Sequence, residues 1–267
     1  MPNLSYMQKA TDRGQLQIHV TTERGFFPIK DASIRLSYTG NPTEIIEELS
    51  TDISGQTAAV ELPAPPLEYS MEPSEFQPYS EYTIQVNASG YRPINISGIS
   101  VLPDKTSIQN VRMETATVEN PLERNIVITA NTLYGNFPPK IPEDEIKPMT
   151  ESGEIVLSRV VIPEYVIVHD GPPSDSSAND YYVRYRDYIK NVASSEIYAT
   201  WPDAALRANI LAIMSFTLNR VYTEWYRNKG YDFTITSSTA FDHKFVYGRN
   251  IFSNISNIVD EMFNSYL

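Results

Sequence analysis

Cysteine is absent from the 267-residue chain. This absence excludes disulfides, zinc–thiolate sites, iron–sulfur clusters and thiol nucleophiles. Histidine is scarce, and His19, His169 and His243 are too isolated to give a His-Glu-x-x-His or similar spacing. The eleven glycines are scattered, and neither a phosphate-binding loop nor a Gly-x-Ser-x-Gly elbow occurs. We therefore expect neither a bound metal nor a cofactor.

The chain also lacks long apolar runs and an excess of positive charge. No run of 18 apolar residues occurs, and residues 1–15 contain no apolar segment. We therefore expect no membrane insertion, and no ordinary secretory signal is visible. The 33 acidic residues outnumber the 21 basic ones, which gives a formal charge of −12. Such a surface repels nucleic-acid phosphates and anionic membranes, so we expect no nucleic-acid partner.

What the chain does contain is an ordinary globular composition, spread over two regions of different construction. Hydrophobic residues make up 41% of the chain and charged residues 20%, and its length exceeds the usual size of one domain. Of the 19 prolines, 18 precede residue 174. We predict an α+β protein with two domains: an antiparallel β-sandwich over residues 14–114, a connector over 115–159, and a mainly helical domain over 160–267.

The first region alternates polar and apolar residues with period two, which is typical of half-buried strands. Glycine, proline and asparagine turn signals separate these segments, and short strands at this spacing favour a sandwich. The predicted strands cover residues 15–20, 32–38, 57–62, 82–88, 94–101 and 108–113. Residues 63–78 are rich in proline, glutamate and serine and are predicted to form a surface loop.

The connector contains the sequence NFPPKIP at residues 136–142, followed by the acidic residues 143–145. Consecutive prolines hold an extended conformation and resist helix formation. Two interpretations stay open: a plain linker, or an exposed arm where proteases cut.

The last region has the pattern of one buried strand followed by helices. The strand is predicted over residues 160–169, and the helices over 185–195, 202–229 and 250–266. Pro202 suits the start of the second helix, and Gly230 suits a left-handed residue after its end.

Glu196 is distinguished by its surroundings, because it lies where the first of these helices should end. The negative end of the helix dipole and the nearby apolar side chains Ile197, Tyr198 and Trp201 would both raise the pKa of its carboxyl group. A general acid needs such a raised pKa, and aromatic rings such as Tyr198 and Trp201 stack on sugar faces. The alternative is a solvated acid at a helix end.

A second group of polar residues follows the second helix. Ser237, Ser238, Thr239 and Asp242 lie in a hydroxyl-rich loop. This loop is either a turn or a row of donors that lines a polar substrate groove.

Several strings around Glu196 resemble those of a known family. The strings DYIKNV (residues 187–192), SEI (195–197) and WPDAALRA (201–208) resemble the core pattern of the SpoIID/LytB sporulation family. The strings NVASSEIY (191–198) and TEWYRNKGYDF (223–233) are similar to the catalytic region of SleC-type clostridial spore cortex-lytic enzymes. FPIKDA (27–32) and SGYRP (89–93) resemble a carboxypeptidase-regulatory-like, prealbumin-like sandwich of the kind found as their prodomain.

The resemblance implies a lytic transglycosylase that cleaves spore cortex peptidoglycan during germination. It implies a zymogen that a subtilisin-like Csp protease activates by removing the N-terminal segment. Glu196 would be the catalytic acid and base, and Tyr198, Trp201, Ser237, Ser238, Thr239 and Asp242 would bind the saccharide. The expected location is the cortex and coat region of the spore, with synthesis in the mother cell.

The chain departs from this family at its end. Family catalytic domains continue beyond a helix like 250–266 with glycine-rich motifs, and SleC-type proteins add a peptidoglycan-binding domain, whereas this sequence stops at Leu267. We therefore expect the chain to be truncated relative to the family. A non-catalytic paralogue or fragment that binds peptidoglycan or a partner protein stays open as the alternative function.

Overall fold

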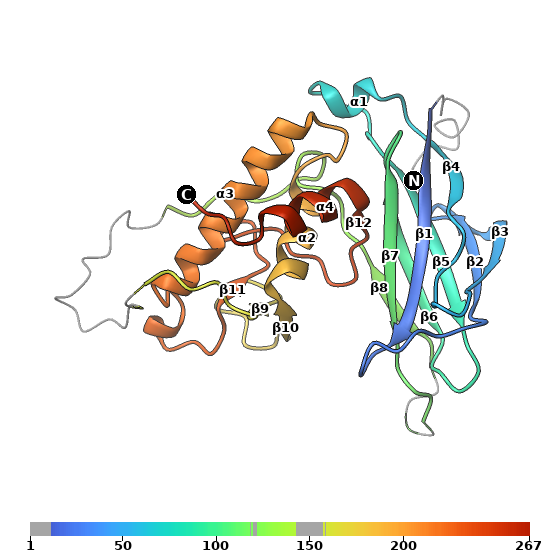
Figure 1. Ribbon diagram of the computed structural model, residues 1–267, viewed down its shortest axis with the longest axis horizontal. Helices are drawn as coiled ribbons and strands as arrows, with labels where there is room; N and C mark the ends of the chain where they lie inside the picture. The colour runs from blue at the N-terminus through green and yellow to red at the C-terminus, as the bar shows by residue number, and fades with distance from the viewer. Residues whose placement is uncertain (1–11, 118, 120–121, 143–156, 158) are drawn as a thin grey trace. The chain divides into compact units, whose positions relative to one another are not determined.

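The computed structural model describes residues 12–117, 119, 122–142, 157 and 159–267 (Figure 1). The chain forms two compact units. Unit 1 comprises Met1–Ala130, Tyr198–Trp201 and Tyr247–Asn254, and unit 2 comprises Asn131–Ile197, Pro202–Val246 and Ile255–Leu267. Unit 1 is therefore built from three segments that are far apart in the sequence.

Unit 1 contains two β-sheets, with strand orders β12-β7-β1-β4 and β3-β2-β5-β6-β8. Strands β1 and β6, which belong to different sheets, contact each other, so the unit is a β-sandwich. The strands are β1 (Asp12–Thr22), β2 (Ser33–Tyr38), β3 (Asn41–Ser50), β4 (Val60–Ala64), β5 (Ser80–Asn87), β6 (Ile94–Val101), β7 (Thr106–Met113), β8 (Arg124–Val127) and β12 (Ile251–Phe252).

The predicted alternation explains how these strands form a core. In β1, Leu16, Ile18 and Val20 are buried, and more exposed residues alternate with them. Such alternation places every second side chain on the buried face of a sheet. Two strand pairs, β1–β7 and β6–β8, are parallel, so the sandwich is mixed rather than purely antiparallel.

Four elements of unit 1 fall outside the predicted strands. They include β8, which lies in the predicted connector, and β12, which lies in the segment predicted as the helix 250–266. The other two are β3 and a one-turn helix. Strand β3 pairs with β2 at the edge of its sheet, and most of its side chains are exposed. The predicted surface loop over residues 63–78 includes the end of β4 and the one-turn helix α1 (Glu68–Met71).

Unit 2 combines a small sheet with helices. The sheet has strand order β10-β9-β11, in which β9 pairs antiparallel with β10 and parallel with β11. Its elements are β9 (Tyr165–His169), β10 (Asp180–Arg184), α2 (Tyr185–Glu196), α3 (Asp203–Tyr222), the 3-10 turn η2 (Arg227–Lys229) and β11 (Ile235–Thr236); α4 (Ser253–Met262) begins in unit 1 and continues into unit 2. The fold class α+β is confirmed, but the description of this region as mainly helical was wrong, because a sheet and the irregular segment after β11 make up much of it.

The end of α3 differs from the prediction for a definite reason. The helix stops at Tyr222, and Glu224 adopts a left-handed backbone conformation with φ 47°. Glu224 N donates to Val221 O, and Trp225 N donates to Arg220 O, which is the Schellman pattern of helix termination. Gly230 is left-handed as predicted, with φ 84°, but it follows η2 instead of α3. This early stop turns Trp225 and the residue after it back toward Arg220.

Within the described parts of the chain, no helix combines the length and the apolar character that are needed to cross a bilayer.

Candidate active site

Glu196 is the last residue of α2, and its carboxylate is partly buried inside unit 2. Burial raises the pKa of Glu196 above its ordinary value. A hydrogen bond from the backbone of Lys244 and the charge of Lys140 both lower this pKa, but their effect is smaller than that of burial. The direction agrees with the sequence prediction, and desolvation is its main cause.

The hydrogen bond from Lys244 is short and well defined. Its backbone N–H donates to Oε1 of Glu196 at 2.6 Å. Lys244 belongs to the irregular segment after β11, so a residue 48 positions along the chain orients the carboxylate. A hydrogen bond from a backbone amide to a carboxylate is among the stronger protein hydrogen bonds and fixes its geometry.

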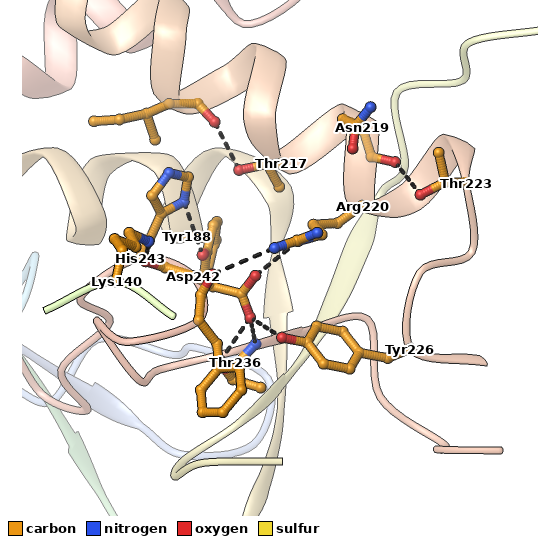
Figure 2. A network of polar contacts seen from close by, with 12 residues as sticks. Lys140, Tyr188, Thr217, Asn219, Arg220, Thr223, Tyr226, Thr236, Asp242 and His243 are labelled. Atoms are coloured by element: carbon orange, nitrogen blue, oxygen red, sulfur yellow. Dashed lines mark hydrogen bonds and ion pairs between the residues drawn. The ribbon is translucent and has the colours of Figure 1, made fainter. Parts of the chain in front are cut away.

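Asp242, two residues before Lys244, anchors this segment through the contacts of its carboxylate, which Figure 2 shows. Its carboxylate is fully buried and accepts four hydrogen bonds. One oxygen accepts from Arg220 Nε at 2.7 Å; the other accepts from Tyr226 Oη at 2.6 Å and from the backbone N and Oγ1 of Thr236 at 2.9 and 2.6 Å. A buried charge with complete pairing of this kind holds its neighbours in one arrangement.

Arg220 is the positive partner in this network, and it comes from α3. Its side chain is only 2% exposed. The guanidinium carbon lies 4.6 Å from the Phe216 ring centroid and 4.4 Å from that of Trp225, so an aromatic residue from within α3 and one just beyond it shield the ion pair. The Schellman termination of α3 is what brings Trp225 and Tyr226 into these positions.

His243 and Asn191 fix the residues on either side of Lys244. Burial lowers the pKa of His243 to about 3, so its imidazole is neutral at physiological pH. The Tyr188 hydroxyl lies 3.3 Å from Nδ1 of His243. Asn191 of α2 donates from Nδ2 to Val246 O at 2.8 Å and accepts from Val246 N at 3.0 Å.

Part of the predicted connector packs within unit 2. Thr132 N donates to Ser195 O at 2.9 Å, and Ile141 N donates to Ala240 O at 2.8 Å. Lys140 Nζ donates to Asp242 O (Figure 2). The acidic residues 143–145, and with them 143–156 and 158, lie outside the described residues. Residues 131–142 are therefore bound to Ser195, next to Glu196, and to the segment with Ala240 and Asp242 that leads to Lys244. The predicted boundaries at 114/115 and 159/160 stay predictions.

The structure groups the predicted site residues unequally. Glu196, the hydroxyl-rich loop and Asp242 belong to unit 2, whereas Tyr198 and Trp201 belong to unit 1. Trp201 Nε1 donates to Ser70 O at 2.9 Å within unit 1. Ser237, Ser238 and Thr239 are partly buried, and Ser238 O accepts from the backbone N of Asp242 at 2.8 Å. The saccharide-binding role of all six residues stays a prediction.

The sequence analysis missed four contributors to this site. They are Lys140, Asn191, Arg220 and the backbone N–H of Lys244. Each acts through a partner between 22 and 102 positions away in the sequence. The only signal for Arg220 in the sequence was a basic residue that follows the mostly apolar stretch 210–216 of α3.

The comparisons with known proteins cover the two units differently. Residues 178–260 match the SpoIID family, described as stage II sporulation protein. No curated protein gave a match. Solved structures that resemble part of the chain include the Bacillus anthracis TIE protein, with 17% identity over 39% of this chain and 17% of that one (TM-score 0.27).

Two other similar structures are the minor pilin GBS52 of Streptococcus agalactiae and 5-hydroxyisourate hydrolase of Klebsiella pneumoniae. The pilin is 13% identical over 40% of this chain and 46% of that one, with a TM-score of 0.28. The hydrolase is 16% identical over 38% of this chain and 86% of that one, with a TM-score of 0.25. The chain thus spans 17% and 46% of the lengths of the first two structures.

The family match includes α2 with Glu196, α3 with Arg220, and the loop with Asp242 and Lys244. It indicates a sporulation-related cell-wall process. Over residues 178–260, the chain is therefore similar to the SpoIID family of sporulation proteins.

Proposed function

We propose that this chain is the proform, or the N-terminal part, of a lytic transglycosylase that cleaves spore cortex peptidoglycan, with Glu196 as the catalytic acid and base. The observation that carries the proposal is the Glu196 carboxylate: it is partly buried, its pKa is raised by burial, and Lys244 N–H orients it at 2.6 Å. A raised pKa increases the protonated fraction of the carboxyl group at a given pH, which favours its use as a general acid.

One carboxyl group suffices for this reaction. Because Oε1 accepts the Lys244 N–H, the transferable proton sits on Oε2. Glu196 gives this proton to the glycosidic oxygen as the bond from that oxygen to C1 of muramic acid breaks. The carboxylate then takes the proton of the C6 hydroxyl while O6 bonds to C1. The products are a free 4-hydroxyl on the leaving sugar and a 1,6-anhydro-muramic acid end, and Glu196 is protonated again without any water being consumed.

The proposal includes activation by a subtilisin-like Csp protease that cuts the connector. The contacts of residues 131–142 support it, because these residues bind Ser195, which precedes Glu196, and Ala240 in the segment that leads to Lys244. Lys140 in this segment also lowers the pKa of Glu196, which disfavours the acid form that the reaction needs. Cutting the connector would loosen this segment. The proposed setting is the cortex and coat region of the spore.

The test is product analysis by mass spectrometry after the full chain, intact or nicked by a subtilisin-like protease, is incubated with decoated spore cortex. We expect 1,6-anhydro-muramic acid ends, with more product after nicking. Glu196→Gln keeps the shape but removes the proton, and should lower the rate by about two or more orders of magnitude. Glu261→Gln is the matched control, because it removes an exposed carboxylate that pairs with Arg207.

Two outcomes would contradict the proposal. Products with free reducing muramic acid ends would mean hydrolysis, for which Glu196 alone is not enough. Unchanged cortex that nevertheless retains the nicked protein would favour the alternative, a non-catalytic protein that binds peptidoglycan.

A further inference from the structure

We propose that Asp242 is a positioning residue for Glu196: it fixes the chain segment that presents Lys244 N–H to the Glu196 carboxylate. The inference deepens the proposed function and rests on it for the catalytic meaning of Glu196. This role differs from direct contact with the saccharide, because all four hydrogen bonds that the Asp242 carboxylate accepts come from protein groups.

The first step is that the Asp242 carboxylate has its acceptor sites filled. A carboxylate has about four lone-pair positions. Arg220, Tyr226 and Thr236 supply four donors at 2.6–2.9 Å, and the side chain has no solvent exposure. A sugar hydroxyl would have to displace one of these donors in order to bind, so recognition of the saccharide is a poor use of this group.

The second step is that Asp242 lies two residues before Lys244, on one side of it, while Asn191 holds Val246 two residues after it. His243 and Phe245, between these anchors, are buried. Lys244 N–H is therefore fixed from both directions. Asn191 belongs to the same helix as Glu196, so it also keeps the segment in register with that helix.

The third step concerns direction. The Lys244 N–H stabilises the charged carboxylate and so lowers the pKa of Glu196. Loosening Asp242 should weaken this hydrogen bond and raise the pKa. Among the described residues, the other titratable groups that interact with Glu196 are Lys140 and Tyr188, and the substitutions proposed below replace neither of them.

The test is a 13C NMR titration of the Glu196 side-chain carboxyl in the full chain, assigned by its loss in Glu196→Gln. Tyr226→Phe removes one donor to Asp242 and keeps both charges of the Asp242–Arg220 pair. Tyr185→Phe is the matched control, because within the described part of the chain its buried hydroxyl has no hydrogen-bond partner. We expect the pKa of Glu196 to rise by roughly 0.5 unit or more in Tyr226→Phe and to stay unchanged in the control.

A second variant sets the upper limit of this effect and avoids any loss of core packing. Replacing the amide of Lys244 by an ester removes the N–H while leaving every side chain in place. It should raise the pKa of Glu196 at least as much as Tyr226→Phe does. An unchanged pKa in Tyr226→Phe, alongside a raised pKa in the ester, would overturn the positioning role. An unchanged pKa in the ester would overturn it as well.

The pH–rate profile supplies the catalytic readout. Glu196 must be protonated at the start of the reaction, so the rate falls on the alkaline limb of the pH–rate profile. A raised pKa of Glu196 moves this alkaline limb to higher pH. A variant that only lowered the folded fraction would reduce the rate without moving the limb. The NMR titration needs no turnover, so a wild-type chain without activity would sink the proposed function and leave the positioning role to be decided by the pKa shifts.

Discussion

Replacing the neutral, buried His243 by asparagine should remove a defined part of the acid sensitivity of unit 2. The imidazole is 8% exposed, and its pKa is lowered from 6.5 to about 3. Burial is the main cause, because it disfavours the charged imidazolium. The nearby charges of Lys140 and Arg220 lower this pKa further, while Asp242 raises it.

The magnitude follows from the two pKa values. Between pH 6.5 and pH 3, the unfolded state binds a proton at His243 that the folded state does not, so stability falls as the pH falls through this window. From pH 8 to pH 5 the loss is about 2 kcal/mol, which is the cost of leaving an ordinary histidine unprotonated 1.5 units below its pKa. This figure holds for any folded pKa well below 5.

The assay uses the distribution of the two tryptophans, since Trp201 belongs to unit 1 and Trp225 to unit 2. In a Trp201→Phe background, Trp225 fluorescence follows the urea unfolding of unit 2. The loss of stability from pH 8 to pH 5 should be about 2 kcal/mol smaller in His243→Asn than in its parent. Val192→Ala, which shortens a fully buried side chain of α2, should destabilise unit 2 equally at both pH values. If His243→Asn and its parent lost the same stability from pH 8 to pH 5, the imidazole would be protonated in the folded state at pH 5. The argument that burial keeps it neutral would then fail.

Three further predictions concern stability. Glu224→Gly should raise the free energy of unfolding by about 1 kcal/mol in urea melts, because glycine adopts the left-handed conformation of φ 47° without strain; a lower value would contradict the Schellman assignment. Glu196→Gln should stabilise the protein at pH 7. Because the pKa of Glu196 is raised in the folded state, the folded state loses stability as the pH rises above 4.5, the ordinary pKa of a glutamate. Melts at several pH values should show this pH-dependent loss of stability in the parent and not in the variant. Asn250→Ala should cost about 1–3 kcal/mol, because its side-chain amide hydrogen-bonds both the N–H and the carbonyl of Ser100 inside unit 1. A cost equal to that of Asn110→Ala, at an exposed asparagine of β7, would argue against these bonds.

Most longer strands of unit 1 could be predicted because one face of each is buried, whereas the mostly exposed β3 could not. Strand β6 was predicted with its observed ends, since its apolar residues are enclosed by the core. Strand β3 was missed because its sequence NPTEIIEELS has charged side chains along an exposed edge, and its strand form comes from pairing with β2. Charged side chains on an edge strand discourage pairing with strands of other molecules. The charges that prevented the prediction of β3 therefore protect this edge of the sheet.

The candidate site divides in the same way. The raised pKa of Glu196 could be anticipated, because a helix end beside apolar residues is visible in the sequence. The network of Asp242 could not, since its donors come from α3, from the turn after α3 and from β11. These donors come together because α3 ends just before Glu224, which adopts a left-handed conformation. The sequence has no glycine there to signal the end of the helix.

The three-segment construction of unit 1 makes a specific prediction about proteolytic activation. A cut between residues 143 and 159 separates residues 1–142 from the rest of the chain, but β12 pairs with β7, and Gln109 Nε2 donates to Gly248 O at 2.9 Å. These contacts join the two products within one folded unit, so the fragments should elute together in size-exclusion chromatography and separate only in urea. Asn250→Ala combined with Phe252→Ala should weaken the pairing and lower the urea concentration needed for separation, because both side chains are buried in unit 1. Spontaneous separation after the cut would show that the C-terminal segments do not hold the sandwich. Retention would mean that activation acts first by releasing residues 131–142 from the surroundings of Glu196, before any loss of the N-terminal fragment.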